Sequence, residues 1–134
     1  MESYARNFIR VSILSLLLGM LLGLAMAGST ALTVYIPVHT HLLLIGFMAM
    51  MIFGVGYHII PRFQGHAQIP WAWATLHFWL ASAGLVLMLL GWVLRIQRRG
   101  PSWILELGGG LEFTGVIVFL VIIWRGLRSA KGAR

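Results

Sequence analysis

The sequence predicts an all-α membrane protein with four transmembrane helices. Of its 134 residues, 60% are hydrophobic and only 10% are charged, and the mean hydropathy is +0.91. Soluble domains carry about 25% charged residues, so this composition excludes an ordinary soluble protein. Four apolar segments are each long enough to cross about 30 Å of hydrocarbon as a helix. We place them at residues 8–26, 38–60, 71–94 and 103–124, in a single transmembrane domain covering residues 1–134.

The first segment begins like a signal peptide, because the basic residues Arg6 and Arg10 stand near its start. Its apolar run is long for the core of a signal peptide, and only a short turn, residues 28–37, separates it from the second segment. We therefore expect a retained helix, with cleavage after the Ala-Met-Ala at 25–27 as the alternative. The other connections, residues 61–70 and 95–102, are also too short to hold a soluble domain.

Basic residues stand at the ends of the predicted helices and set their orientation. The net charge of +7 therefore does not indicate a nucleic-acid partner, and the lipid bilayer is the expected environment. By the positive-inside rule, both termini lie on the cytoplasmic side, in the cytoplasmic membrane of a bacterium or archaeon. The residues that would share this side are Arg6, Arg10, Arg62, Arg125, Arg128, Lys131 and Arg134.

The loop before the fourth segment departs from this charge pattern. Arg95, Arg98 and Arg99 fall on the outer side, where the positive-inside rule predicts few basic residues. Contact with phospholipid headgroups explains them without any special partner and is the simpler explanation. A bound group that carries negative charge is the alternative.

Two histidines, His39 and His41, stand at the outer start of the second segment. Ionisable side chains inside a bilayer are costly and usually functional. On an α-helix, positions two residues apart differ by about 200° in direction and about 3 Å in height. The two imidazoles therefore point to nearly opposite faces, so they cannot grip one metal together, but each can serve a different cofactor. The alternative is a pair of interfacial histidines that cap the helix near water.

Other ionisable residues lie away from this pair. His58 is about 25 Å from His41 along the second helix, near its cytoplasmic end. His77 stands in the cytoplasmic half of the third helix. Glu106 opens the fourth helix, where the helix dipole favours an acidic residue without any functional reason. Glu112 lies deeper in that helix, and three states remain open for it: protonated, paired with an arginine, or part of a proton path.

Haem is a cofactor that would use both the histidines and the outer arginines. Neutral imidazoles bind haem iron axially, and arginines pair with its propionates in a forked geometry. Arg98 and Arg99 are on the same outer side as His39 and His41. Haem b, bound without covalent attachment, is the default type, because the chain has no cysteine to hold a haem or a metal through sulfur.

A series of short motifs covers about half of the chain. They are His39-Thr40-His41, Gly46, Phe53, Gly56-Tyr57-His58, Pro61-Arg62-Phe63 and Gly65, then His77-Phe78-Trp79, Gly84, Arg98-Arg99 and Pro101. Their order resembles the last third of haem-copper oxidase subunit I. In that family one helix begins with His-x-His, the next carries a similar His-Phe-Trp, and an arginine pair comes before the last helix. The resemblance implies four helices arranged like one four-helix arc of that subunit.

The resemblance also implies roles for individual residues. In the family, the first histidine of the pair is the axial ligand of a high-spin haem, and the second is a ligand of a low-spin haem. By motif match, His39 and His41 are haem ligands, and the pair Arg98-Arg99 holds propionates. His58 and His77 match family histidines that do not bind haem, so we expect them to be structural.

A symmetric assembly follows from the same resemblance. The family's twelve helices form three arcs of four around a pseudo-threefold axis, so a chain that resembles one arc can close into a homotrimer. His41 of one subunit and His39 of the next would then clamp one haem at each interface. A dimer with two shared haems obeys the same opposite-face constraint, and we prefer the trimer.

We expect a membrane b-type cytochrome that relays electrons, between a donor and an acceptor that the sequence does not identify. No copper and no catalytic residue are expected, because the family's adjacent His-His pair and its His-Pro-Glu-Val-x-Tyr-like segment are both missing. Two axial histidines leave no open coordination position, which favours electron transfer. The alternatives are a catalytic membrane haem enzyme acting on nitric oxide or quinol, and a cofactor-free accessory subunit of a larger oxidase.

Overall fold

The computed structural model describes residues 2–63 and 69–131, with side chains described as far as residue 126. Gly65 and Arg134, which the sequence analysis uses, lie outside the described residues. The described chain is helical and has no strand, which confirms the predicted all-α class. Four helical stretches are long and apolar enough to span a membrane: Ser3–Gly28, Thr30–Phe63, Trp71–Ile96 and Trp103–Gly126.

The first, third and fourth stretches are α-helices that extend beyond the predicted apolar segments. They are α1 (Ser3–Gly28), α4 (Trp71–Ile96) and α5 (Trp103–Lys131). The extra turns carry basic residues, such as Arg6 on α1 and Arg125 on α5. A helix does not stop where its apolar segment stops, because its backbone hydrogen bonds continue into the interfacial region and long basic side chains reach water from there.

The second stretch is a composite of four helical pieces. They are η1 (Thr30–Tyr35), a 3₁₀-helix, α2 (Ile36–His41), η2 (Leu42–Ala49), a π-helix, and α3 (Met50–Phe63). The predicted turn at residues 28–37 is therefore wrong over most of its length, because η1 and the start of α2 occupy it. Pro37 lies in the first turn of α2, where a missing backbone N–H costs nothing, so this proline begins a helix instead of breaking one.

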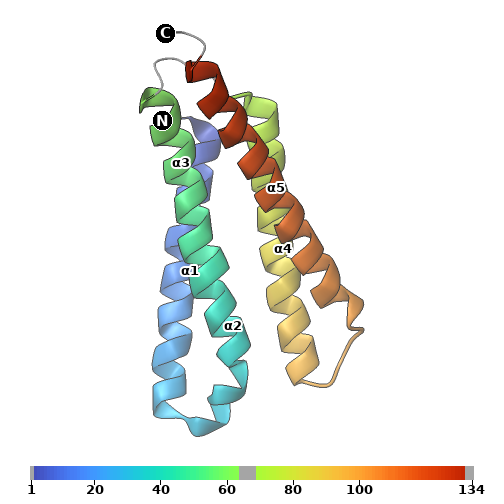
Figure 1. Ribbon diagram of the computed structural model, residues 1–134. Helices are drawn as coiled ribbons and strands as arrows, with labels where there is room; N and C mark the ends of the chain where they lie inside the picture. Colours follow the sequence, from blue (N-terminus) through green and yellow to red (C-terminus); the bar gives the residue numbers. More distant parts are fainter. Residues whose placement is uncertain (1, 64–68, 132–134) are drawn as a thin grey trace.

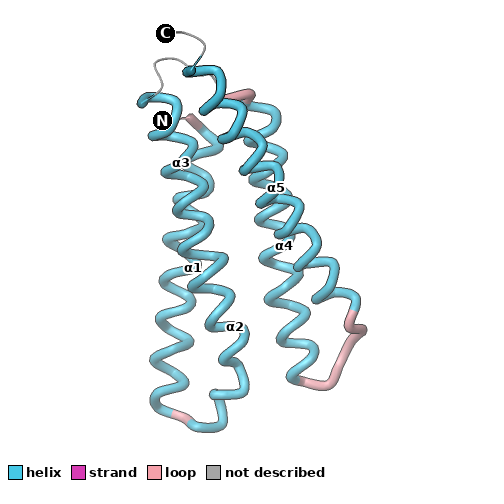
Figure 2. Tube along the Cα trace, viewed as in Figure 1, coloured by secondary structure: helices cyan, strands magenta, loops and turns pink. Residues whose placement is uncertain are grey.

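The helices form two hairpins, which Figure 1 shows side by side. In one hairpin α1 packs along η2 and α3, and in the other α4 packs along α5. The start of α1 and the end of α5 lie at one end of the molecule, which we call the terminal end (Figure 1). The opposite end, which we call the distal end, holds η1 and the turn between α4 and α5 (Figure 2).

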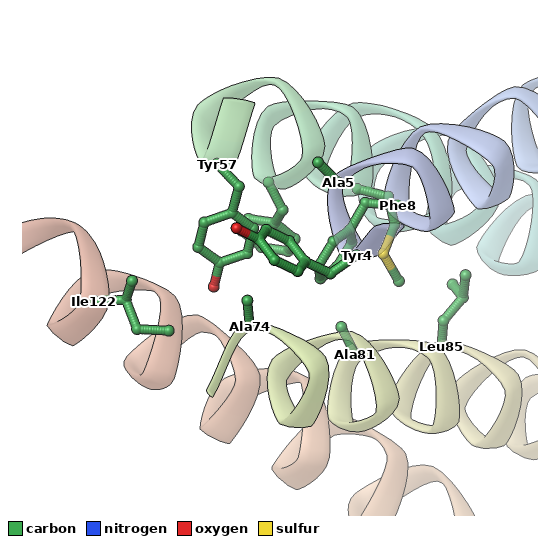
Figure 3. Packing of buried hydrophobic residues seen from close by; sticks show 10 residues of the cluster. Tyr4, Ala5, Phe8, Tyr57, Ala74, Ala81, Leu85 and Ile122 are labelled. Atoms are coloured by element: carbon green, nitrogen blue, oxygen red, sulfur yellow. The ribbon is translucent and has the colours of Figure 1, made fainter. Parts of the chain in front are cut away.

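An aromatic cluster joins the two hairpins near the terminal end. Tyr4 and Phe8 of α1 pack against Phe53 and Tyr57 of α3, with ring centroids 5.7–5.9 Å apart for three of these pairs. Figure 3 shows this packing, with the small side chain Ala74 of α4 beneath Tyr57. The outward faces remain apolar and exposed, as on α1, where lipid would cover Leu17, Leu21 and Leu24.

Glycines bring α4 and α5 into close backbone contact. A Cβ atom added to Gly108 would lie 2.5 Å from the backbone nitrogen of Met88, and one added to Gly91 would lie 2.8 Å from the Cα of Leu105. Small residues at such crossings let helices approach closely in membranes. The spacing of this hairpin therefore depends on the absence of side chains at these two positions.

Candidate functional site

The two predicted histidine ligands lie on α2, at the distal end of the molecule. His41 is the last residue of α2, and the π-helix η2 begins at the next residue. π-Helical turns are rare and occur frequently at functional sites, because they change the direction of the side chains on either side of them. Both histidines are partly buried.

His39 faces α1. Its Nδ1 atom lies 2.9 Å from the carbonyl oxygen of Gly19, so the ring N–H donates a hydrogen bond to the α1 backbone. The ring also lies against Gly23, where an added Cβ would come within 2.8 Å of the His39 Cε1 atom. Two glycines one turn apart on α1 thus provide the hydrogen-bond acceptor and the space that this imidazole occupies.

His41 faces α4 instead. Its Nδ1 lies 2.6 Å from the carbonyl oxygen of Pro37, one turn earlier on its own helix. The imidazole centroid is 5.8 Å from the ring of Trp92, at an interplanar angle of 42°. The two histidines therefore contact different helices, as the two-residue spacing predicts.

The hydrogen bonds give both imidazoles the same protonation pattern. A carbonyl oxygen can only accept, so Nδ1 carries the proton in each ring and Nε2 keeps its lone pair. Among the described residues, no hydrogen bond uses the Nε2 atom of His39 or His41. Metal-binding histidines have this arrangement, in which a second group holds Nδ1–H and leaves Nε2 to the metal.

Each histidine would have to act as a single axial ligand. Within the described ranges, no group of three or more His, Cys, Asp or Glu side chains could hold a metal ion together. An isolated imidazole with a free Nε2 suits the axial position of haem, where the macrocycle supplies the other four ligands. The donor set therefore fits haem better than a free metal ion.

The two predicted propionate partners lie in the exposed turn after α4. The backbone amide of Arg99 donates to the carbonyl of Leu94 at 2.8 Å, and the amide of Arg98 donates to that of Arg95 at 3.1 Å. Arg98 has a φ of 53°, so it takes the left-handed position that usually ends a helix at glycine. The structure brings neither side chain into contact with His39 or His41 among the interactions of the described residues.

Two residues near the end of α4 are linked to His41 through ring contacts, and sequence reasoning missed them as a pair. Trp92 packs against His41, and the Arg95 guanidinium lies 5.6 Å from the centroid of the Trp92 ring. Both belong to the last turns of α4 and are three residues apart, which places them on one helix face. That spacing was the available signal, although the contact with α2 depends on tertiary packing.

His58 and His77 have the environments of structural residues. His77 is fully buried, and its Nδ1 lies 2.8 Å from the hydroxyl of Tyr57. The rings of Phe8 and Phe53 stand 4.9 and 4.6 Å from its imidazole. His58 accepts a hydrogen bond of 2.7 Å at Nε2 from the guanidinium of Arg62. Each of these two rings thus has a side-chain hydrogen-bond partner, whereas His39 and His41 are hydrogen-bonded to backbone carbonyls. The Nε2 atom of His77 has no partner in the described structure.

Glu112 lies in the contact between α4 and α5. Its side chain is 7% exposed, and its Oε1 atom has no hydrogen-bond partner in the described structure. A Cβ at Gly84 would lie 2.9 Å from the Glu112 Cγ, so that glycine makes room for the side chain. None of the arginines in the described structure forms an ion pair with it. Pairing with an arginine, one of the three expected states, is therefore not what the structure shows.

The fold and the histidine pair define an integral membrane protein with two single, pre-oriented imidazoles at one end. The chain is similar to the cbb3-type cytochrome c oxidase subunit CcoN1 of Stutzerimonas stutzeri, with 27% identity over 121 residues. The similarity covers 71% of this chain and 26% of that protein, so the chain spans about a quarter of the relative's length. No family model and no solved structure matches the chain. This distant similarity supports the resemblance to haem-copper oxidase subunit I.

Proposed function

We propose that the protein is a membrane b-type cytochrome, related to haem-copper oxidase subunit I, that binds haem through His39 and His41 and relays electrons. One observation carries the proposal: both imidazoles donate Nδ1–H to a backbone carbonyl and leave Nε2 free. The similarity to an oxidase subunit supports it independently. A helix-capping pair near water would not require two rings with the same protonated atom and different helix neighbours.

In this function the protein orients two ligands and limits access to the iron. Bound haem would supply a centre that gains and loses one electron. The Gly19 carbonyl holds the His39 ring in place, and the Pro37 carbonyl holds the His41 ring. If both axial positions are filled by imidazoles, no position is open for oxygen or nitric oxide, so electron transfer is favoured over catalysis.

We propose that haem is bound between subunits. His39 contacts α1 and His41 contacts α4, so the two rings of one chain do not face each other across a single flat macrocycle. We propose a homotrimer in which His41 of one subunit and His39 of the next bind the same haem. Cyclic symmetry closes such an assembly with equal interfaces. A dimer with two shared haems satisfies the same geometry and is the second choice.

Spectroscopy of the purified protein tests the haem assignment. The protein, in mild detergent, is reconstituted with haem, and spectra of the oxidised and dithionite-reduced forms are recorded with and without carbon monoxide. We expect sharp low-spin α and β bands on reduction that carbon monoxide does not move. Light scattering of the same sample gives the number of subunits, with three expected.

The other outcomes separate the competing functions. A carbon monoxide shift would show an open iron position and favour an enzyme acting on nitric oxide or quinol. Absence of haem binding after reconstitution would contradict the cytochrome. The remaining candidate would then be an accessory subunit of a larger oxidase, which is favoured by one observation: the chain matches only about a quarter of an oxidase subunit.

A further inference from the structure

The pair Trp92 and Arg95 stands beside His41, and no function described so far uses it. The imidazole of His41 and the indole of Trp92 are 5.8 Å apart, and the guanidinium of Arg95 lies 5.6 Å from the indole centroid. α2 and α4, which carry these residues, belong to different hairpins (Figure 1). Trp92 thus contacts both His41 of α2 and Arg95 near the end of α4, at the distal end.

The indole nitrogen of Trp92 needs a hydrogen-bond acceptor. Nε1 is buried, and it has no partner among the described residues. An indole N–H can only donate, so a second donor cannot satisfy it. Buried polar groups in folded proteins nearly always have a partner. An acceptor from outside the described chain would satisfy this donor.

Arg95 gives the same position a positive charge. Its side chain is exposed, and within the described chain it forms no ion pair. The guanidinium lies over the Trp92 ring, and this cation–π contact keeps it close to the indole. A guanidinium offers several N–H donors in one plane, which match the two oxygens of a carboxylate. The missing acceptor is thus best supplied by an oxyanion.

None of the three glutamate side chains, all of which lie among the described residues, supplies this oxyanion. Glu2 lies at the terminal end, at the opposite end of the bundle from α2. Glu112 packs against Gly84, which is about 12 Å along α4 from Trp92. Glu106 is exposed in the first turn of α5, and no ion pair with it occurs in the described structure.

We infer that Trp92 and Arg95 form a carboxylate-binding site for the group held at His41. The inference rests on the proposed function, because a propionate of haem is then the carboxylate within reach. It differs from the expectation for Arg98 and Arg99, which lie one turn further on, in the exposed turn. Trp92 would donate one hydrogen bond and Arg95 one or two, so both are positioning residues for the cofactor.

Binding of haem and of haem dimethyl ester, in which both propionates are masked, tests this site. Affinities are measured by absorbance titration of the detergent-purified protein. We expect the unchanged protein to prefer haem by about tenfold or more, the value of one charge-assisted hydrogen bond. Arg95→Gln and Trp92→Phe should bind haem more weakly and lose this preference, while binding of the ester stays the same. Arg10→Gln, on α1 away from this site, is the matched control and should keep the preference. Arg98→Gln and Arg99→Gln are measured beside it, because a contribution of that arginine pair would show there.

The outcomes distinguish this inference from the function on which it rests. If the unchanged protein binds neither haem nor the ester, both fail. If haem binds but Arg95→Gln and Trp92→Phe prefer haem over its ester as strongly as the unchanged protein does, only the carboxylate-site inference is wrong. Loss of the preference in Arg98→Gln or Arg99→Gln, with Arg95→Gln unaffected, would assign the carboxylate to that arginine pair. Circular dichroism of each variant confirms that the helices are intact, which excludes unfolding as the cause of weaker binding.

A lipid phosphate is the other source of an oxyanion at this place. Binding of the haem-free protein to vesicles of phosphatidylglycerol and of phosphatidylcholine distinguishes it. If Arg95→Gln lowers binding to the anionic vesicles but does not change the preference for haem over its ester, a lipid occupies the site and the inference is overturned. Equal vesicle binding by Arg95→Gln and the unchanged protein, together with loss of the ester preference, supports it.

Discussion

The histidines at the two ends of the molecule differ in what holds their Nδ1 atoms and in how deeply the rings are buried. At the terminal end, His77 is fully buried, is bonded to the Tyr57 hydroxyl and is surrounded by aromatic rings. At the distal end, His39 and His41 are partly exposed and bonded to backbone carbonyls. Side-chain packing makes the first ring part of the core. Backbone hydrogen bonds orient the other two rings, and in the proposed function their Nε2 atoms bind haem.

Removing either distal imidazole gives the largest expected effect. In His39→Ala or His41→Ala, the iron loses an axial ligand, so stable haem binding should be abolished while the helices remain. The measurement is haem content per polypeptide after reconstitution, with circular dichroism of the same samples. His58→Ala is the matched control, because that histidine is engaged with Arg62 away from the site and should leave haem content unchanged. Full haem content in His41→Ala would refute the ligand assignment.

Removing the terminal imidazole should produce the opposite pattern. His77→Ala creates a cavity among packed aromatic rings and leaves the Tyr57 hydroxyl without its partner, so we expect a loss of about 3 kcal/mol in the free energy of unfolding. Unfolding is followed by circular dichroism during titration with a denaturing detergent. Haem affinity of the folded fraction should not change. If His77→Ala lost haem and kept its stability, the contrast between the two ends would be wrong.

Hydropathy and helical periodicity predicted most of the fold and part of the site. Four apolar runs of membrane-spanning length predicted four helices, because a lipid environment leaves few other ways to satisfy backbone hydrogen bonds. The two-residue spacing of His39 and His41 predicted that the rings face different neighbours, because helical geometry depends on the chain alone. The identity of those neighbours, α1 and α4, was not predictable in the same way.

The sequence did not predict several local features of the helices and of the contacts between them. Pro37 was placed in a turn, but it opens α2. The π-helix after His41 has no local sequence signal, since its residues are ordinary apolar helix formers. Nothing in the sequence of α4 singles out Trp92 and Arg95. Their position next to the site follows only from the packing of α4 beside α2. The arginine pair 98–99 was easier to notice, because two adjacent charges interrupt an apolar sequence.

Crowding the contact between α4 and α5 should affect both stability and the distal site. Gly91 is next to Trp92, and a Cβ there would lie 2.8 Å from the backbone of Leu105. Gly91→Ala should therefore push the end of α4 away from α5 and cost about 2 kcal/mol of unfolding free energy. Haem affinity should fall as well, because Trp92 moves with the helix. Gly110→Ala is the control: nothing lies within 4 Å of an added Cβ, so stability should stay equal or rise.

The smallest effect separates the hydrogen bond at His77 from the packing around it. Tyr57→Phe keeps the ring that contacts Tyr4, Phe8 and Phe119 but removes the hydroxyl, 2.8 Å from the Nδ1 of His77. We expect a loss of about 1 kcal/mol, the usual net value of one hydrogen bond. The same denaturing-detergent titration measures it. A loss as large as that of His77→Ala would mean that the hydrogen bond, and not the aromatic packing, holds the terminal histidine. The difference between side-chain packing and hydrogen-bonded tethering at the two ends would then disappear.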